Sequence, residues 1–241
     1  MYGNVLDVKG IDLEMNLKQQ DAKSALEYIR SGMVLGLGTG STTRYFIDML
    51  GKEIQKGSLG GIQAVPTSEA TADQARLLDI PLTTLSENPQ LDYAVDGADE
   101  VDPKLNLIKG LGCALLREKV VETHARRFIV VVDESKIVPH LGVLGPLPVE
   151  IIQFEAHAHV GWLNTLDCQA KLLIEEDGSP VITDNGNYLA HCWFSGGIPD
   201  PHTLARTLAD RPGIVEHGLF LGMADTVIVA EVDGIKIVER E

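Results

Sequence analysis

The sequence predicts an α/β fold in which a mostly parallel sheet carries helices on both faces. Short apolar runs alternate with stretches of helical spacing between residues 33 and 133. Such alternation is typical of parallel strands joined by crossover helices. The pattern changes after Leu144-Gly145-Pro146-Leu147-Pro148, where strand patterns outnumber helical ones. This change predicts a small α+β insert within the larger fold.

The first part of the chain supplies the elements of the parallel sheet. Residues 1–15 are expected to form a loosely held arm, and the apolar spacing over residues 17–30 predicts a helix. Buried strands are expected at residues 33–38, 61–65, 80–85, 91–96 and 128–132. Helices are expected at residues 43–50, 69–78 and around 114–120. Four turns then fall at one edge of the sheet and predict a single pocket, namely residues 39–42, 67–68, 96–99 and 133–136.

The second part of the chain supplies the insert and a final hairpin. Strands are expected at residues 149–154, 171–174, 188–194 and 214–216, with helices at 156–166 and 201–208. Residues 226–232 and 235–238, joined across Asp233-Gly234, predict a hairpin that returns to the first sheet. We therefore expect a large domain over residues 1–145 and 217–241, and a lid domain over residues 146–216.

Composition limits the possible classes of function. Hydrophobic residues make up 44% of the 241 residues, which predicts a folded globular protein. The formal net charge of −15 argues against nucleic-acid binding, because that requires a basic surface. A small anionic substrate is compatible with this charge, since a few lysines and helix N-termini are enough to bind one.

The cysteines and the N-terminus indicate a compartment. Cys113, Cys168 and Cys192 are few, odd in number and without a spacing pattern, which is typical of reduced thiols. The first residues lack the apolar core of a signal peptide. No run reaches the roughly 18 to 20 apolar residues that span a bilayer. We expect a cytoplasmic protein that does not bind membranes.

A glycine-rich turn, Gly36-Leu37-Gly38-Thr39-Gly40-Ser41, lies between an expected strand and an expected helix. Glycines let a ligand approach the backbone, and hydroxyls and free N–H groups at a helix start can bind an anion. The turn is neither a Walker loop nor a dinucleotide fingerprint. By itself it is equally compatible with a tight turn and with a phosphate or polyol site.

Chemical groups are concentrated in residues 91–121. An expected buried strand ends at Asp96, and Asp99, Lys109 and a helix with Glu118 follow. Acidic groups at the carboxyl end of a buried strand are costly unless they have a function. Each group also has an ordinary explanation: a solvated helix face for the glutamate, turn formation for the aspartates and a surface position for the lysine.

A metal site is not expected. Glu155, His157 and His159 carry ligand-type side chains, but no third carboxylate or cysteine lies at ligand spacing. Cys113 precedes apolar residues and is expected to pack as a small side chain rather than act as a nucleophile.

Six short motifs follow one another along the chain: GLGTGST at 36–42, DGADE at 96–100, KGLGCALLREK at 109–119, DESK at 133–136, PLPVE at 146–150 and TDNGN at 183–187. In sequence and order they resemble type A ribose-5-phosphate isomerase. The resemblance implies a Rossmann-like α/β domain with a smaller α+β, ferredoxin-like lid. It also implies interconversion of ribose 5-phosphate and ribulose 5-phosphate through an enediolate, without a metal or other cofactor.

The resemblance implies a role for each matching residue. Glu118 matches the catalytic base, and Lys109 matches the lysine beside the reacting oxygens. Asp96 and Asp99 match the sugar-contacting acids, which are also implicated in ring opening. Lys136 matches a lysine at the phosphate end. The implied substrate-binding residues are Thr39, Gly40, Ser41, Thr42, Asp96, Gly97, Ala98, Asp99, Lys109, Gly110, Leu111, Gly112 and Lys136.

The lysine motif departs from the usual K-G-G-G-A-A-L of that family. Leu111 and Cys113 replace a glycine and an alanine. Leu111 is the change expected to narrow the pocket or alter an N–H contact. The sequence therefore defines the type of reaction better than the substrate preference.

Two other classes of function use related folds. A non-catalytic sugar-phosphate sensor would normally carry a DNA-binding module, and no basic helix-turn-helix precedes residue 17. An amino-sugar phosphate deaminase or a CoA transferase is not favoured, because DGADE followed by the lysine motif is the isomerase pattern. We also expect a homodimer or homotetramer that takes a small sugar phosphate as its substrate.

Overall fold

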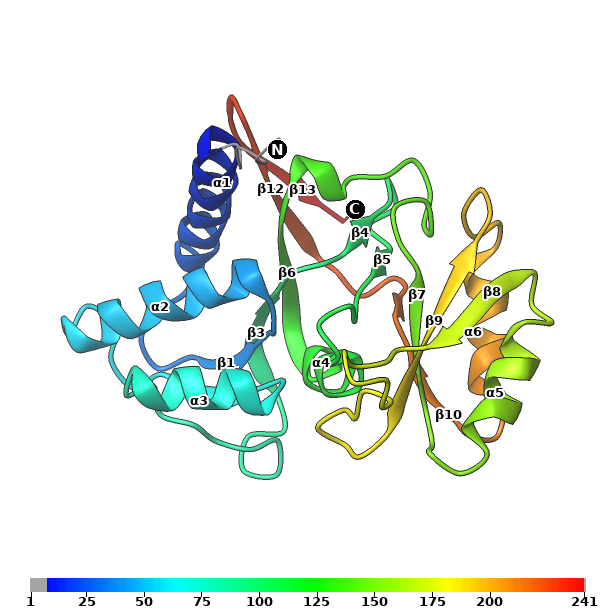
Figure 1. Cartoon of the computed structure of the whole chain (residues 1–241). Helices are drawn as coiled ribbons and strands as arrows, with labels where there is room; N and C mark the ends of the chain where they lie inside the picture. The colour runs from blue at the N-terminus through cyan, green and yellow to red at the C-terminus, as the bar shows by residue number, and fades with distance from the viewer. Residues whose placement is uncertain (1–7, 241) are drawn as a thin grey trace, which may run out of the picture.

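The computed structural model describes the backbone of residues 8–240 and the side chains of residues 17–240. Its central element is a six-stranded sheet in the order β13-β12-β6-β3-β1-β2 (Figure 1). Neighbouring strands run parallel except in the hairpin of β12 and β13. The predicted mostly parallel sheet and the predicted C-terminal hairpin are both confirmed. The strands are β1 (Val34–Leu37), β2 (Gln63–Pro66), β3 (Leu91–Asp96), β6 (Ala125–Asp133), β12 (Thr226–Glu231) and β13 (Gly234–Glu239).

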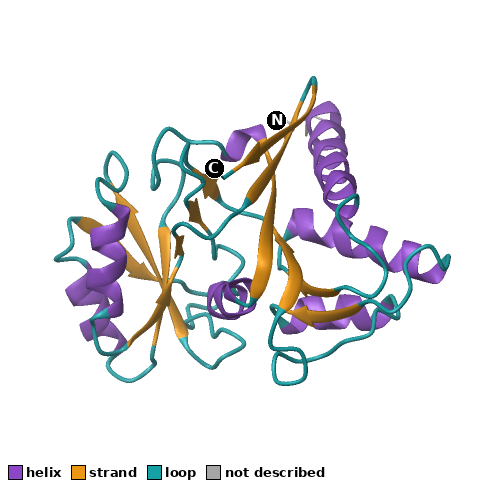
Figure 2. Cartoon of the chain, turned by 180° about the vertical axis from the view of Figure 1, so that it is seen from behind, coloured by secondary structure: helices purple, strands orange, loops and turns teal. Residues whose placement is uncertain are grey.

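Three helices cover one face of this sheet (Figure 2). They are α1 (Val8–Leu26), α2 (Ser41–Gln55) and α3 (Glu69–Leu77). Ala22 and Ala25 of α1 are fully buried, and their small side chains let the helix approach the sheet closely. Phe46 and Leu50 of α2 fill the same apolar cluster with residues of β1, β3 and β6. These contacts fix the start of α2 at the carboxyl end of β1.

The opposite face carries one helix and a small sheet. The helix is α4 (Leu115–Thr123), so the predicted helices on both faces are confirmed. Leu115 of α4 and Phe220 pack there against Phe128 and Val130 of β6. The small sheet has the order β11-β5-β4, formed by β4 (Glu100–Val101), β5 (Leu107–Ile108) and β11 (Leu219–Phe220).

A second, antiparallel sheet has the order β10-β7-β9-β8. Along the chain its elements are β7 (Leu147–Ile151), α5 (Ala156–Leu163), β8 (Cys168–Leu172), β9 (Tyr188–Phe194), α6 (Pro201–Ala209) and β10 (Ile214–His217). This βαββαβ order, with the fourth strand beside the first, is ferredoxin-like, as the resemblance implied. Both helices pack on one face of the sheet and bury a separate apolar cluster. The boundaries proposed from the sequence for the two domains stay a prediction.

Two predictions near the N-terminus need correction. The expected loose arm over residues 1–15 is wrong from Val8 onward, because α1 begins there; residues 1–7 lie outside the described part. The helix ends at Leu26, before the expected limit at Arg30. The apolar residues Val8, Ile11 and Met15 lie at helical spacing and extend the pattern toward the N-terminus, although Gly10 lowers the helix propensity of this stretch.

The strand expected at residues 80–85 is reduced to a single bridge between Leu82 and Ala64. Pro81 has no N–H to donate to a ladder, and Glu87 accepts bonds from Thr83 and Thr84 that turn the chain. β7 begins at Leu147, earlier than the sequence pattern indicated, with Pro148 near its start. Among the described residues, no helix has the length and apolar character needed to cross a membrane.

Candidate active site

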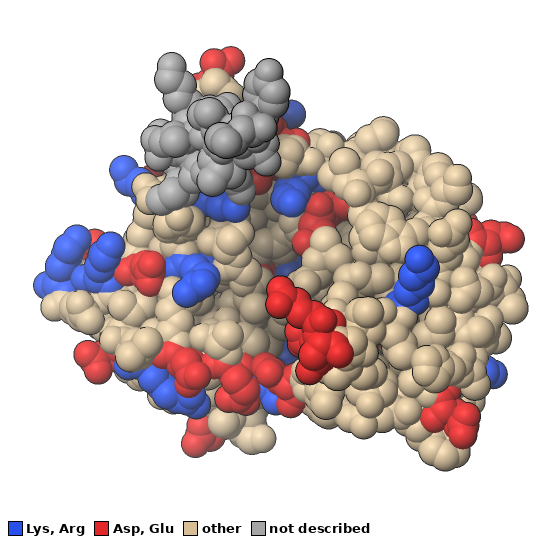
Figure 3. Space-filling model, in the orientation of Figure 1, with Lys and Arg blue, Asp and Glu red and all other residues tan. Residues whose placement is uncertain are grey.

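A cavity of about 550 Å³ lies at the carboxyl ends of β1, β3 and β6. The surface is hollowed between the part with the six-stranded sheet and the part with the four-stranded sheet (Figure 3). Three of the four predicted turns line this cavity, with residues 39–42, 97–99 and 133–136. The fourth turn stands behind it, where Thr67 and Ser68 hydrogen-bond to the Thr39 hydroxyl at 2.8 Å each. The predicted convergence of loops into one pocket is therefore confirmed for three turns, and the turn of residues 67–68 binds Thr39 from behind the cavity.

One end of the cavity is suited to a phosphate group. Gly40 has φ 145°, which L side chains rarely adopt, and it leads directly into the first turn of α2. The first N–H groups of a helix have no partner within the helix and favour an anion. Lys136 lies in the short 3-10 helix of residues 134–136 and lines the same cavity. Lys18 of α1 also lines it. Sequence analysis missed Lys18, because nothing in its local pattern distinguishes it from a surface lysine.

Asp96 closes the carboxyl end of β3. It is fully buried and does not line the cavity. Its Oδ1 accepts hydrogen bonds from the Thr39 N–H at 3.1 Å, the Thr43 hydroxyl at 3.1 Å and the Gly97 N–H at 2.7 Å. Its Oδ2 lies 2.8 Å from Lys109 Nζ. Asp96 thus connects the start of α2 to Lys109, which lines the cavity.

Lys109 is the buried cation of the site. Its side chain is 3% exposed, and its Nζ donates to the Gly97 carbonyl at 2.7 Å. The same Nζ lies 3.4 Å from Glu118 Oε2 and 3.5 Å from Glu122 Oε1. Burial acts to lower the pKa of Lys109, but Asp96, Glu118 and Glu122 outweigh it and raise that pKa well above its usual value. Lys109 therefore stays charged through the neutral range.

Glu118 reaches the cavity from the first turn of α4. Burial raises its pKa to about 8, against the opposing effect of Lys109, and the nearby Asp96 and Asp99 add to the rise. A general base works best when its pKa lies near the working pH. Glu118 is the carboxylate in the cavity wall that meets this condition, and a solvated helix face is ruled out as its position.

Asp99 lines the cavity opposite the helix, and its Oδ2 accepts the Leu111 N–H at 3.1 Å. Burial raises the pKa of Asp99. The Leu111 side chain is 40% exposed and does not line the cavity. Leu111 therefore does not narrow the pocket as expected. It contributes its N–H, which donates to Asp99. The Cys113 side chain packs on the cluster around Phe128, and burial raises the pKa of its thiol.

Glu122 is a second residue near the cavity, after Lys18, that was not predicted from the sequence. It follows Glu118 by four positions on α4, a spacing that places both carboxylates on one helix face. It is 3% exposed, and neither of its carboxylate oxygens has a hydrogen-bond partner among the described residues. Burial raises its pKa well above the usual value, against the effect of Lys109. The four-residue spacing from Glu118 was the signal in the sequence that could have identified Glu122.

Potential metal ligands do not gather in the described part of the chain. No group of three or more His, Cys, Asp or Glu side chains there could hold a metal ion. His157 and His159 lie on the helix α5, and His159 is 8% exposed.

Fold and cavity together define a class of protein: an α/β protein with a polar cavity at the carboxyl ends of its parallel strands, where a buried carboxylate lies beside a buried ammonium. The family model of ribose 5-phosphate isomerase A (phosphoriboisomerase A) matches residues 63–234. The chain belongs to this family and is an aldose–ketose isomerase of the pentose phosphate pathway.

Named relatives cover nearly all of the chain. A ribose-5-phosphate isomerase A of Synechococcus sp. (strain JA-3-3Ab) is 48% identical over 225 residues, which cover 93% of this chain and 97% of the relative. A probable chloroplastic ribose-5-phosphate isomerase 3 of Arabidopsis thaliana is 46% identical over 230 residues, which cover 93% of this chain and 83% of the relative.

Solved structures agree with the fold. The ribose 5-phosphate isomerase of Plasmodium falciparum gives a TM-score of 0.91 at 35% identity, covering 94% of this chain and 99% of the other. A D-ribose-5-phosphate isomerase in complex with phospho-erythronic acid gives 0.91 at 44% identity, covering 93% and 98%.

Proposed function

We propose that this chain interconverts ribose 5-phosphate and ribulose 5-phosphate with Glu118 as the base that moves the proton between C2 and C1. The observation that carries this proposal is the position of the Glu118 carboxylate, which is buried in the cavity wall 3.4 Å from Lys109 Nζ. Because burial raises its pKa to about 8, the ionised carboxylate is a stronger base than an ordinary glutamate, which favours proton abstraction from carbon.

In the proposed reaction, ionised Glu118 removes the proton from C2 of the open-chain aldose. The electron pair forms the C1–C2 double bond and leaves negative charge on O1, which gives an enediolate. The O2 hydroxyl proton passes to O1, C2 becomes the carbonyl, and Glu118 returns its proton to C1. Negative charge develops on the sugar oxygens during this step. Lys109 is a fixed cation close to that position, and preorganised charges of this kind stabilise a developing oxyanion.

The remaining residues divide between the two ends of the substrate. Asp99 faces the cavity near Glu118, and its raised pKa lets it exchange a proton with a sugar hydroxyl during ring opening. Asp96 holds Lys109 in place, and direct contact between Asp96 and the sugar stays a prediction. At the other end, Lys18, Lys136 and the first turn of α2 bind the phosphate.

We further propose a reducing, cytoplasmic location and a homodimeric or homotetrameric assembly. Cys113, Cys168 and Cys192 are all free thiols, which favours a reducing compartment. Light scattering of the purified protein at micromolar concentration tests the assembly, and a monomer there would refute it.

The direct test is turnover of ribose 5-phosphate in EDTA, for the unmodified protein and for Glu118→Gln. We expect activity that survives EDTA and a decrease in kcat of about 100-fold or more in the variant, because a positioned base typically contributes that much. Undiminished turnover by Glu118→Gln would refute the role of Glu118. Binding of ribose 5-phosphate without turnover in the unmodified protein would favour the sugar-phosphate sensor.

A further inference from the structure

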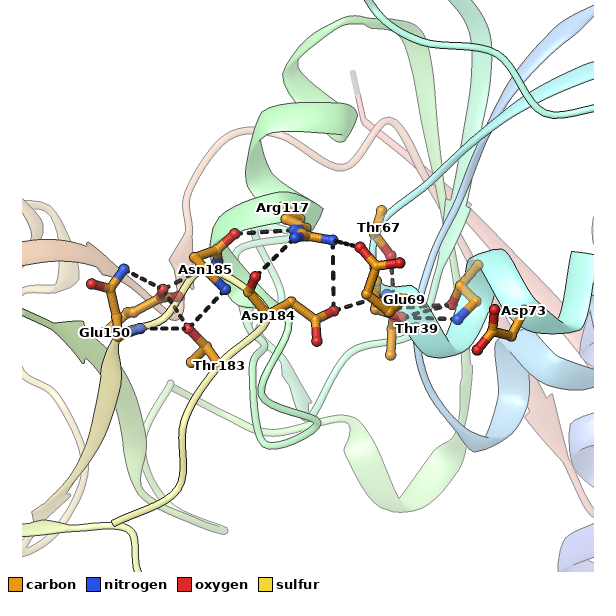
Figure 4. A network of polar contacts seen from close by, with 12 residues as sticks. Thr39, Thr67, Glu69, Asp73, Arg117, Glu150, Thr183, Asp184 and Asn185 are labelled. Carbon is orange, nitrogen blue, oxygen red and sulfur yellow. Dashed lines mark hydrogen bonds and ion pairs between the residues drawn. The ribbon is translucent and has the colours of Figure 1, made fainter.

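Arg117 precedes the proposed base on α4 but does not line the cavity. Its guanidinium extends across the gap between the two parts of the molecule and makes three hydrogen bonds (Figure 4). Nε donates to Asn185 Oδ1 at 3.0 Å, Nη2 to the Asp184 carbonyl at 2.9 Å and Nη1 to Glu69 Oε1 at 2.8 Å. One side chain therefore joins α4 to α3 and to the loop of residues 183–187.

The loop end of this network is anchored in the four-stranded antiparallel sheet. Asn185 Nδ2 donates to Glu150 Oε1 at 3.1 Å, and Glu150 lies fully buried on β7. Thr183 and Asn187 donate to the same oxygen at 2.9 Å each. The acceptors that Arg117 reaches in this loop are therefore held by a buried carboxylate.

The α3 end of the network leads to the cavity. The Glu69 N–H donates to Asp184 Oδ2 at 2.8 Å, so α3 and the loop also contact each other directly. Ser68, the residue before Glu69, bonds to the Thr39 hydroxyl at 2.8 Å. Thr39 lines the cavity, and Figure 4 follows this chain of contacts from Thr39 to Glu150.

α4 depends on such contacts for its orientation. It has nine residues, and Ala114 at its N-cap offers no side chain to bond to the free N–H groups. On its other side, Lys119 donates to Glu216 Oε1 at 2.7 Å and to the His217 carbonyl at 2.6 Å. Glu118 stands between these two tethers. These tethers act together with the apolar packing of Leu115 and Val121 of α4.

We propose that Arg117 is a positioning residue, which locks α4 to α3 and to the 183–187 loop and thereby holds the Glu118 carboxylate in line for proton transfer. This inference rests on the proposed role of Glu118. A planar guanidinium reaches three acceptors at once, which a lysine ammonium cannot do at these positions. A displacement of about 1 Å at a reacting group can lower the rate by about 100-fold.

The test compares Arg117→Ala and Arg117→Lys with Arg126→Ala as the matched control. Arg126 also forms an ion pair, 3.6 Å from Asp92; its side chain is 62% exposed and does not line the cavity. For each purified protein we would measure kcat, KM and Tm, together with the kinetic isotope effect on kcat for ribose 5-phosphate deuterated at C2. The isotope effect separates a slower proton transfer from a smaller fraction of active protein.

We expect both Arg117 variants to lose about tenfold or more in kcat, with a larger isotope effect and a smaller change in KM. Tm should stay within about 3 °C of that of Arg126→Ala, because partly exposed ion pairs add little stability. An unchanged isotope effect, or full recovery by Arg117→Lys, would overturn the inference. Glu118→Gln is run in parallel: if it keeps its turnover, the role of Glu118 has failed, whereas an inactive Glu118→Gln beside normal Arg117 variants rejects the positioning role alone.

Discussion

Glu118 has its unusual proton affinity because of where the fold places it. In the sequence it stands between a basic residue and Lys119, a pattern typical of a solvated helix face. In the structure it is 2% exposed, and burial is the largest cause of the rise in its pKa to about 8. The proposed base function of Glu118 and its raised pKa therefore have one physical origin.

The pH dependence of kcat/KM follows from this pKa. In the proposed mechanism the ionised form of Glu118 is the active one, and its fraction rises with pH through about 8 in the free enzyme. We expect kcat/KM to increase between about pH 7 and pH 9 and then to level off. Lys109 adds no decrease in that range, because its pKa is raised well above the usual value.

Initial rates at low ribose 5-phosphate concentration over this pH range provide the measurement. The substrate phosphate has its second pKa at about 6, so data from pH 7 upward exclude its titration. A constant kcat/KM over the range would mean that Glu118 is already ionised at neutral pH.

At the scale of secondary-structure elements, the site depends on how closely β1 approaches β3. Gly38 follows β1, and a Cβ atom added there would lie 2.0 Å from the Cγ of Asp96. No side chain fits unless Asp96 moves, and Asp96 holds Lys109. The second glycine of the Gly36–Ser41 turn is therefore required by packing between strands, in addition to any contact with a ligand.

Gly38→Ala is expected to lower both stability and turnover. Overpacking typically costs about 1–3 kcal/mol, and the displaced Asp96 would also release Lys109. Urea unfolding and kcat measure the two effects. Gly60→Ala is the control, because an added Cβ there meets nothing within 4 Å. Equal stability of the two variants would show that β1 and β3 can separate without cost.

Element prediction succeeded where local patterns are strong. β3, β9 and the final hairpin match their apolar runs, because strand signals of alternating or continuous apolar residues are local. It failed at α1, which begins at Val8 within the expected arm, and at residues 80–85, where Pro81 and a side-chain turn prevent a strand ladder. The failure at residues 80–85 comes from interactions that hydrophobic spacing does not report.

At the scale of the whole molecule, the buried acids link stability to pH. Burial raises the pKa of Asp99, Glu118 and Glu122 in the folded protein, whereas such carboxyls titrate at about 4 in an unfolded chain. Between these values the folded protein holds protons that the unfolded chain has released. These three groups therefore make the free energy of unfolding decrease as the pH rises from about 4 toward about 8. His217 opposes this decrease below about pH 6.5, because burial lowers its pKa to about 4.

Urea unfolding at constant ionic strength, at several pH values in this window, measures the decrease. Glu118→Gln removes one of the three titrating groups and should make the decrease less steep. An identical slope in the variant would show that Glu118 does not take up a proton on folding.

The molecule as a whole brings the site together from distant segments. Lys109 follows β5, Glu118 and Glu122 lie on α4, and the Asp184 carbonyl that binds Arg117 lies 67 residues further along the chain. Sequence analysis identified most of the cavity residues by their motifs. It missed Lys18, Glu122 and the contacts of Arg117, because each depends on which segments meet in space.

The sequence by itself determined the α/β class, the order of most elements and the motifs that identify the family. These depend on periodicity and turn chemistry, which act between residues close together in the chain. Only the tertiary structure decided which charged groups are buried together, and therefore which carboxylates hold a proton at neutral pH. The physical reason is that burial and separation set the energy of a charge, and both arise from contacts between segments far apart in sequence.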